Sequence, residues 1–201
     1  MAIAFIANVA VGKLRAASLQ LFADAINSLI TVSPTYTARS TVVGAAVASV
    51  TISGIPSTLK RLRITWAARG DNAVQDELIT MQVGGDTGAN YSYTNYQVQN
   101  TTLTGGSAHG STSGVVGLCT GSTATATVFA TGTILLTPWD NINAGSLGYT
   151  FDNQCIGTAV ANHFITGGGG MYSGASARTS VTFLPQANNF IAGTDFQLEG
   201  W

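Results

Sequence analysis

Apolar and polar residues alternate with a period of two over much of the chain from about Val47 onward. The clearest case is the segment 59–69, LKRLRITWAAR. One face of it would carry Leu62, Ile64, Trp66 and Ala68, and the other would carry Arg61, Arg63, Thr65 and Arg69. A period of two is typical of a strand that buries one face of an antiparallel sheet. We therefore predict a half-buried strand here, with Trp66 as a structural residue of the core.

Similar patterns predict further strands, separated by turn signals such as Gly54 and Pro56. These strands are expected at 3–11, 47–52, 77–83, 91–99, 115–119, 124–137, 147–151, 159–165, 178–184 and 194–200. Loops are expected at 33–41, at the polar segment 100–114 and at the GGGG run 167–170. Many short strands with frequent turns are typical of a sandwich or a barrel, whereas alternating helices and strands would indicate a parallel α/β fold. The predicted class is all-β, an antiparallel β-sandwich.

One segment has helical spacing instead. Within residues 14–30 the apolar positions recur every three or four residues, which predicts a helix. The positions that define its apolar side are Leu14, Leu19, Phe22, Ile26 and Leu29. The predicted organisation is a first strand of the sandwich in 1–12, a helical insert serving as an assembly arm in 13–46, and a β-sandwich domain in 47–201.

The amino-acid composition indicates that the surface of the protein carries little charge. Charged residues make up 8% of the chain and hydrophobic residues 45%, against about 25% charged residues in a typical soluble protein. A surface with so little charge is typical of a protein covered by partners in an assembly. The net charge of −1 gives no field for collecting nucleic acid, and we read the cluster Lys60, Arg61 and Arg63 as a solvated or interface-facing strand surface. No nucleic-acid partner is expected.

The N-terminal apolar run lacks the basic region that precedes the apolar part of a signal peptide, and no run of about 18 apolar residues predicts a membrane helix. We expect synthesis and assembly in a bacterial cytoplasm, with no membrane partner.

Candidate chemistry is sparse. Cys119 and Cys155 are interpreted as two buried thiols or a single bridge. The run from Asp86 through Gly88 to Asn90 resembles a calcium loop but lacks the later bidentate Glu, so a turn is favoured, in which Gly supplies positive φ and Asp and Asn bond their own backbone. No cofactor or metal is expected.

No signature of catalysis is present either. There is no G-x-S-x-G elbow, neither Cys has an obvious base partner, and His109 and His163 stand alone in sequence. We expect no enzymatic activity. The tyrosines are open to two readings, a carbohydrate-stacking surface or core packing with interface anchoring, of which the second is favoured. They are Tyr91, Tyr93, Tyr96, Tyr149 and Tyr172.

Three blocks carry a resemblance to a known family. They are IANVAVG, the long segment from SVTISGIPS to GGDTGANYSY, and the ending SVTFLPQANNFIAGTDFQLEGW. Within them, Ile55-Pro56, the run Gly85–Tyr91, and Asn189-Phe190 with Gly193 occur in the order and spacing of the family. The chain resembles a family of tailed-bacteriophage virion structural proteins, of tail, fibre, minor structural or capsid-decoration type. It departs from the pattern in the insert and in the ending Leu198-Glu199-Gly200-Trp201.

The resemblance implies a jelly-roll-like sandwich and a place in the virion. The expected function is a capsid decoration or cement protein, or another minor structural protein, acting through protein–protein contacts. The alternative is a receptor- or glycan-binding module of a tail tip or fibre. Expected partners are other copies of the chain, as a trimer by analogy, and other virion proteins such as the major capsid or tail proteins. Expected contact residues are Leu14, Leu19, Phe22, Ile26, Leu29, Arg61 and Arg63.

Overall fold

The computed structural model describes residues 35–140, 145–156 and 163–201. They belong to one compact unit, Pro34–Trp201. The strand expected at 3–11, the helix expected at 14–30 and the contact residues expected on that helix lie outside the described residues.

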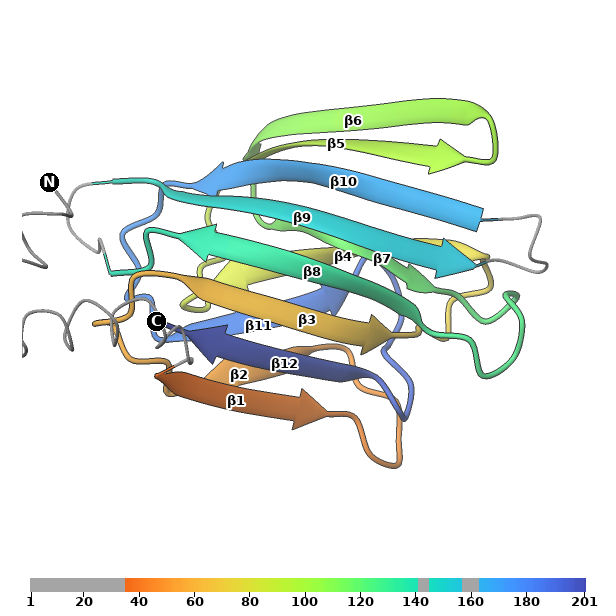
Figure 1. Ribbon diagram of the computed structural model, residues 1–201, viewed down its shortest axis with the longest axis horizontal. Helices are drawn as coiled ribbons and strands as arrows, with labels where there is room; N and C mark the ends of the chain where they lie inside the picture. The colour runs from red at the N-terminus through yellow and green to blue at the C-terminus, as the bar shows by residue number, and fades with distance from the viewer. Residues whose placement is uncertain (1–34, 141–144, 157–162) are drawn as a thin grey trace, which may run out of the picture. The chain divides into compact units, whose positions relative to one another are not determined.

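The described residues form twelve strands in two antiparallel sheets, and no helix occurs among them (Figure 1). The strands are β1 (Tyr36–Thr41), β2 (Val50–Ser53), β3 (Leu62–Ala68), β4 (Asp76–Val83), β5 (Tyr91–Gln99), β6 (Thr102–Ser111), β7 (Gly114–Thr120), β8 (Ala130–Thr137), β9 (Leu147–Ile156), β10 (His163–Tyr172), β11 (Ser180–Pro185) and β12 (Asp195–Gly200). The larger sheet has the order β1-β12-β3-β8-β9-β10-β5-β6, and the smaller sheet has the order β2-β11-β4-β7. The predicted all-β class is confirmed.

The core lies between the two sheets, where β2, β3, β4, β9, β11 and β12 bury every second side chain. In β3 the predicted alternation is seen, with Leu62, Ile64, Trp66 and Ala68 buried. Phe183 of the smaller sheet stacks on Phe196 of the larger sheet, with ring centroids 4.2 Å apart. Contacts of this kind hold two sheets face to face, as in a sandwich.

β1 falls inside the segment 33–41, where a loop was predicted, so that prediction is wrong. It pairs with β12 along its whole length, for example Ala38 with Leu198. Its inward-facing residues Tyr36 and Ala38 pack against the core. The strand alternates between half-buried and exposed positions, a pattern too weakly apolar to stand out in sequence. Residues 36–41 of the predicted insert are therefore part of the larger sheet.

Two other predicted loops are strands. The segment 100–114 contains β6, and the GGGG run 167–170 lies within β10. The glycines are accommodated because aromatic rings occupy the space beside them: a Cβ at Gly167 would collide with the Tyr96 ring, and one at Gly170 with the Tyr149 ring. Glycine in a strand therefore marks close approach here and not a loop.

The prediction that Arg69 shares an exposed face with Arg61 and Arg63 is wrong. Its guanidinium group is buried and donates hydrogen bonds to four backbone carbonyl groups, those of Ser122 (3.3 Å), Ala124 (3.1 Å), Thr125 (2.8 Å) and Val128 (2.9 Å). β3 ends at Ala68, so the alternation of the strand no longer fixes the direction of the next side chain. Arg69 thus fixes the 121–129 loop from within.

The run 84–90 forms a turn. Asp86 accepts hydrogen bonds from the Gly88 amide (2.7 Å), the Asn90 side chain (2.9 Å) and the Tyr172 hydroxyl (2.8 Å). The Gly88 amide, followed by Tyr172, lowers the pKa of Asp86 below its ordinary value. Positive φ occurs at Gly84 and Gly85 and not at Gly88. The glycines that supply positive φ therefore lie just before Asp86 and not between Asp86 and Asn90, where it was predicted.

Candidate functional site

β6 is an open edge strand. It is the last strand of the larger sheet and, among the described strands, it pairs only with β5 (Figure 1). Eight of its ten residues are exposed, and its sequence TLTGGSAHGS contains no Lys, Arg, Asp, Glu or Pro. Natural proteins usually protect an exposed edge with charge or proline, because unpaired backbone groups template pairing with another chain. The edge of β6 therefore has the properties of a protein-contact site.

An apolar patch lies at one end of this edge, on the outer face of the larger sheet. The register places Leu103 opposite Val98 and Val98 opposite Ile165, so the three share one face. Leu103 is 68% exposed and Ile165 is 43% exposed. Tyr96, two residues from Val98 on the same strand, is 49% exposed. We call these four residues the edge patch, and exposed apolar groups of this kind mark interaction sites.

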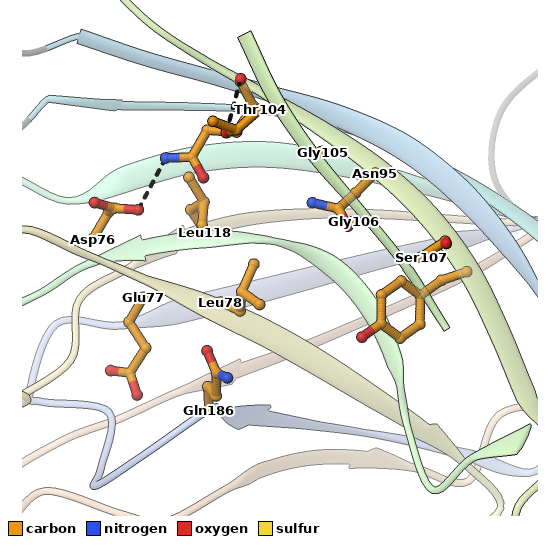
Figure 2. A pocket seen from close by; sticks show the side chains of 12 residues that line it. Asp76, Glu77, Leu78, Asn95, Thr104, Gly105, Gly106, Ser107, Leu118 and Gln186 are labelled. Carbon is orange, nitrogen blue, oxygen red and sulfur yellow. Dashed lines mark hydrogen bonds between the residues drawn. The ribbon is translucent and has the colours of Figure 1, made fainter. Parts of the chain in front are cut away.

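A groove lies under the β5–β6 hairpin, on its other face. Its volume is about 350 Å³, and β4, β5, β6 and β7 contribute to its walls (Figure 2). The lining residues are Asp76, Glu77, Leu78, Tyr93, Asn95, Gln97, Thr104, Gly105, Gly106, Ser107, Leu118 and Gln186.

Polar groups in the groove are organised around one carboxylate. The Gln97 side chain donates a 3.1 Å hydrogen bond to Asp76, and Thr104 donates a 3.4 Å hydrogen bond to the Gln97 backbone carbonyl (Figure 2). Burial raises the pKa of Asp76, and the hydrogen bond from Gln97 opposes that shift. Glu77 accepts a hydrogen bond from the Ala187 amide, and burial raises its pKa as well. In the part of the chain that the structure describes, no Lys or Arg lines the groove.

A second hollow of about 370 Å³ adjoins the first along the smaller sheet. The two share Leu78, Tyr93 and Gln186 as lining residues. The far part of the second hollow is lined by Thr80, Gln82, Thr112, Ser113, Val115, Leu184 and Pro185. Together the two hollows make one extended, uncharged to weakly acidic depression.

The two predicted contact residues that the structure describes, Arg61 and Arg63, do not lie at this site. Arg61 and Arg63 are exposed, and Arg63 forms an ion pair with Glu199 and lies 5.7 Å from the centre of the Trp201 ring. β3 is separated from β6 by four strands of the larger sheet. Leu14, Leu19, Phe22, Ile26 and Leu29 lie outside the described residues.

The five tyrosines do not form one surface. Tyr91, Tyr149 and Tyr172 are buried, and the rings of Tyr91 and Tyr172 pack with centroids 4.9 Å apart. Tyr93 lines the groove, and Tyr96 lies on the outer face. The favoured reading of core packing fits three of the five.

Sequence reasoning missed both the edge strand and the groove. The signal available for β6 was its lack of charge over ten residues, and the signal for the groove was the alternation of Tyr93, Asn95 and Gln97 along one face of β5.

Cys119 and Cys155 are free, buried thiols in the core. Burial raises the pKa of both, that of Cys155 to about 12, so they stay protonated near neutral pH. Among the described residues, no group of three or more His, Cys, Asp or Glu side chains is placed to hold a metal ion. Within that same part of the chain, no helix has the length and apolar character needed to cross a membrane.

No protein-family model, curated protein or solved structure matches the chain. The resemblance to virion proteins therefore stays a prediction from the sequence.

Proposed function

We propose that this chain is a non-enzymatic structural component of a tailed-bacteriophage particle, of capsid-decoration or other minor structural type. Its place in the virion is inferred from the resemblance of its sequence blocks to virion structural proteins. The open edge of β6 is the structural observation that supports the mode of action, because eight of its ten uncharged residues are exposed and available for contact with another chain. The chain acts by binding other copies or other virion proteins, and it resides in particles assembled in the bacterial cytoplasm.

The order of the strands supports a jelly-roll-like sandwich. From β2 to β11 the chain passes between the two sheets at most connections, the exceptions being the β5–β6 hairpin and the β8–β9–β10 meander. Taking that meander as one element, and β1 and β12 as additions, the alternation is that of a jelly roll. Jelly rolls occur in viral capsid proteins and in lectins, an analogy of fold and not of site.

We further propose a homo-oligomer, a trimer by analogy with virion decoration proteins. The low charge of the surface supports self-association, because like-charge repulsion between copies is small. The edge of β6 and the N-terminal helix expected from sequence are the two contact regions of this proposal.

Charge placed on the edge tests the proposed contact. A Leu103→Lys, Ser107→Lys variant of the full chain should keep its thermal stability, since both residues are exposed, and should lose oligomer formation and binding to particles that lack the protein. Thr131→Lys, on the exposed face of β8, is the matched control and should assemble normally. Assembly of the β6 variant with unchanged affinity would refute the edge as the contact.

A second candidate function is receptor or glycan binding at a tail tip or fibre. The polar groove beneath β5 and β6 is the observation that favours it.

A further inference from the structure

The groove offers hydrogen-bonding groups suited to hydroxyl-rich ligands. Asn95, Gln97 and Gln186 carry amides, each with donor and acceptor atoms, and Asp76 adds a carboxylate acceptor. The Asn95 side chain extends from β5 into the space between β5 and β4 (Figure 2). Every sugar hydroxyl can donate one hydrogen bond and accept others, so amides and carboxylates facing a shared space match its needs.

Tyr93 supplies an aromatic surface at the point where the two hollows meet. It is half-buried and lines both of them. Tyrosine combines an apolar ring with a polar hydroxyl group, and it serves well where a ligand has both kinds of surface. A sugar ring has such surfaces, with C–H groups on its faces and hydroxyl groups on its rim.

The charged residues that line the two hollows indicate which ligand charge the groove accepts. Among the described residues, Asp76 and Glu77 are the only acidic ones that line the first hollow, and no Lys or Arg lines either hollow. Anionic ligands such as nucleic acids or acidic sugars are held by Arg and Lys, and here they would meet carboxylates instead. The lining therefore disfavours an anionic ligand. Both carboxylates already accept a hydrogen bond from the protein, and the amides of Asn95, Gln97 and Gln186 suit an uncharged ligand.

The dimensions favour a short chain of sugars. A volume of about 350 Å³ is near the lower end of the range of small-molecule sites, which is about 300–1,000 Å³. The second hollow of about 370 Å³ continues from Tyr93. We propose that this extended groove binds a neutral oligosaccharide, with Tyr93 against a sugar ring and Asp76, Asn95 and Gln97 bonding its hydroxyl groups. This proposal rests on the second candidate function and names its ligand class, and it does not depend on the structural role in the virion.

A panel of immobilised neutral oligosaccharides, of hexose and N-acetylhexosamine units, with sialylated and uronic-acid counterparts, tests the proposal on the purified full chain. The expected result is binding to a subset of the neutral glycans and not to the acidic ones. Calorimetry with the best neutral glycan should then show at least about a tenfold loss of affinity in Tyr93→Ala and in Asn95→Ala.

Tyr96→Ala and Thr94→Ala are matched controls on the opposite, exposed face of β5, and they should bind normally. Asn95→Trp fills the groove without truncating a packed side chain, so it should abolish binding while the protein stays folded. Absence of binding to any neutral glycan, preference for acidic glycans, or equal affinity of Asn95→Trp and the unaltered chain would overturn the proposal. The first of these results would leave the proposed virion role untouched, since particle content is measured separately.

Discussion

The guanidinium group of Arg69 donates a 2.9 Å hydrogen bond to the backbone carbonyl of Val128, although 59 residues separate them in sequence. The same side chain reaches three further carbonyl groups of the 121–129 loop. A buried cation that donates to four backbone carbonyl groups is a structural group, and it fixes the loop that precedes β8.

Removing that side chain tests this reading. Arg69→Ala would leave four carbonyl groups without their donor. Each of them that water does not reach would cost about 1–3 kcal/mol of folding free energy. We expect the free energy of unfolding to fall by at least about 3 kcal/mol, measured by urea denaturation. Arg61→Ala is the control, because Arg61 is exposed, and it should change stability by no more than about 0.5 kcal/mol. Equal stability of the two variants would show that the loop does not depend on Arg69.

Trp66 is expected to act as a core anchor. Its side chain is 4% exposed and lies against Gly117 and Gly132, whose missing side chains make room for its ring. Trp66→Ala should lower the free energy of unfolding by about 3–5 kcal/mol. Leu135→Ala, on the exposed face of neighbouring β8, should cost much less. A Trp66→Ala variant with normal thermal stability would contradict the assignment.

The turn at Asp86 predicts a pH dependence of stability. Because its folded-state pKa lies below the ordinary value of 3.8, the carboxylate contributes stability above that pH and loses it as the pH falls through the lower folded value. Asp86→Asn should therefore be less stable than the unaltered chain near pH 7, and the difference should shrink below about pH 3.8. Thr87→Ala, in the same turn, should show a difference that does not change with pH. A constant Asp86→Asn effect from pH 7 to pH 2.5 would refute this role.

The N-terminal segment is predicted to contribute to assembly. Residues 36–41 form β1, so a deletion that spares the sandwich must end before them, and the boundary at Ser33 suits it. Deletion of residues 13–33, which spares the strand predicted in 1–12, should leave thermal unfolding of the sandwich nearly unchanged and abolish oligomer formation, measured by light scattering.

A triple change on the apolar side of the predicted helix, Leu19→Ala, Phe22→Ala and Ile26→Ala, should reproduce that loss in the full chain. The control is a triple change on its polar side, Gln20→Ala, Asp24→Ala and Asn27→Ala. Normal assembly of the deletion variant would place the interface on the sandwich, and unfolding would place the segment in the core.

The sequence predicted the strands whose apolar residues alternate clearly, and it missed β1, β6 and the glycine-rich part of β10. β3 was predicted because Leu62, Ile64 and Trp66 alternate with polar residues. β6 has no buried face, so no apolar period exists to reveal it, and its small polar residues read as a loop. The glycines of β10 gave a loop signal because the Tyr96 and Tyr149 rings that occupy their space come from other strands.

The candidate site could not be predicted for a related reason. The groove forms only when β5 and β6 pair at the end of the larger sheet, beside β4 and β7 of the smaller one. Asp76 and Asn95 come from different sheets, and their proximity depends on long-range pairing that local patterns do not encode.

Quantitative peptide mass spectrometry of purified particles tests the virion assignment most directly. The particles are those made by the genome that encodes this chain, separated from the lysate by density gradient. We expect the chain to band with the particles in several copies each, at a ratio to the major capsid protein that stays constant across gradient fractions. Presence of the chain in the lysate together with its absence from purified particles would contradict it.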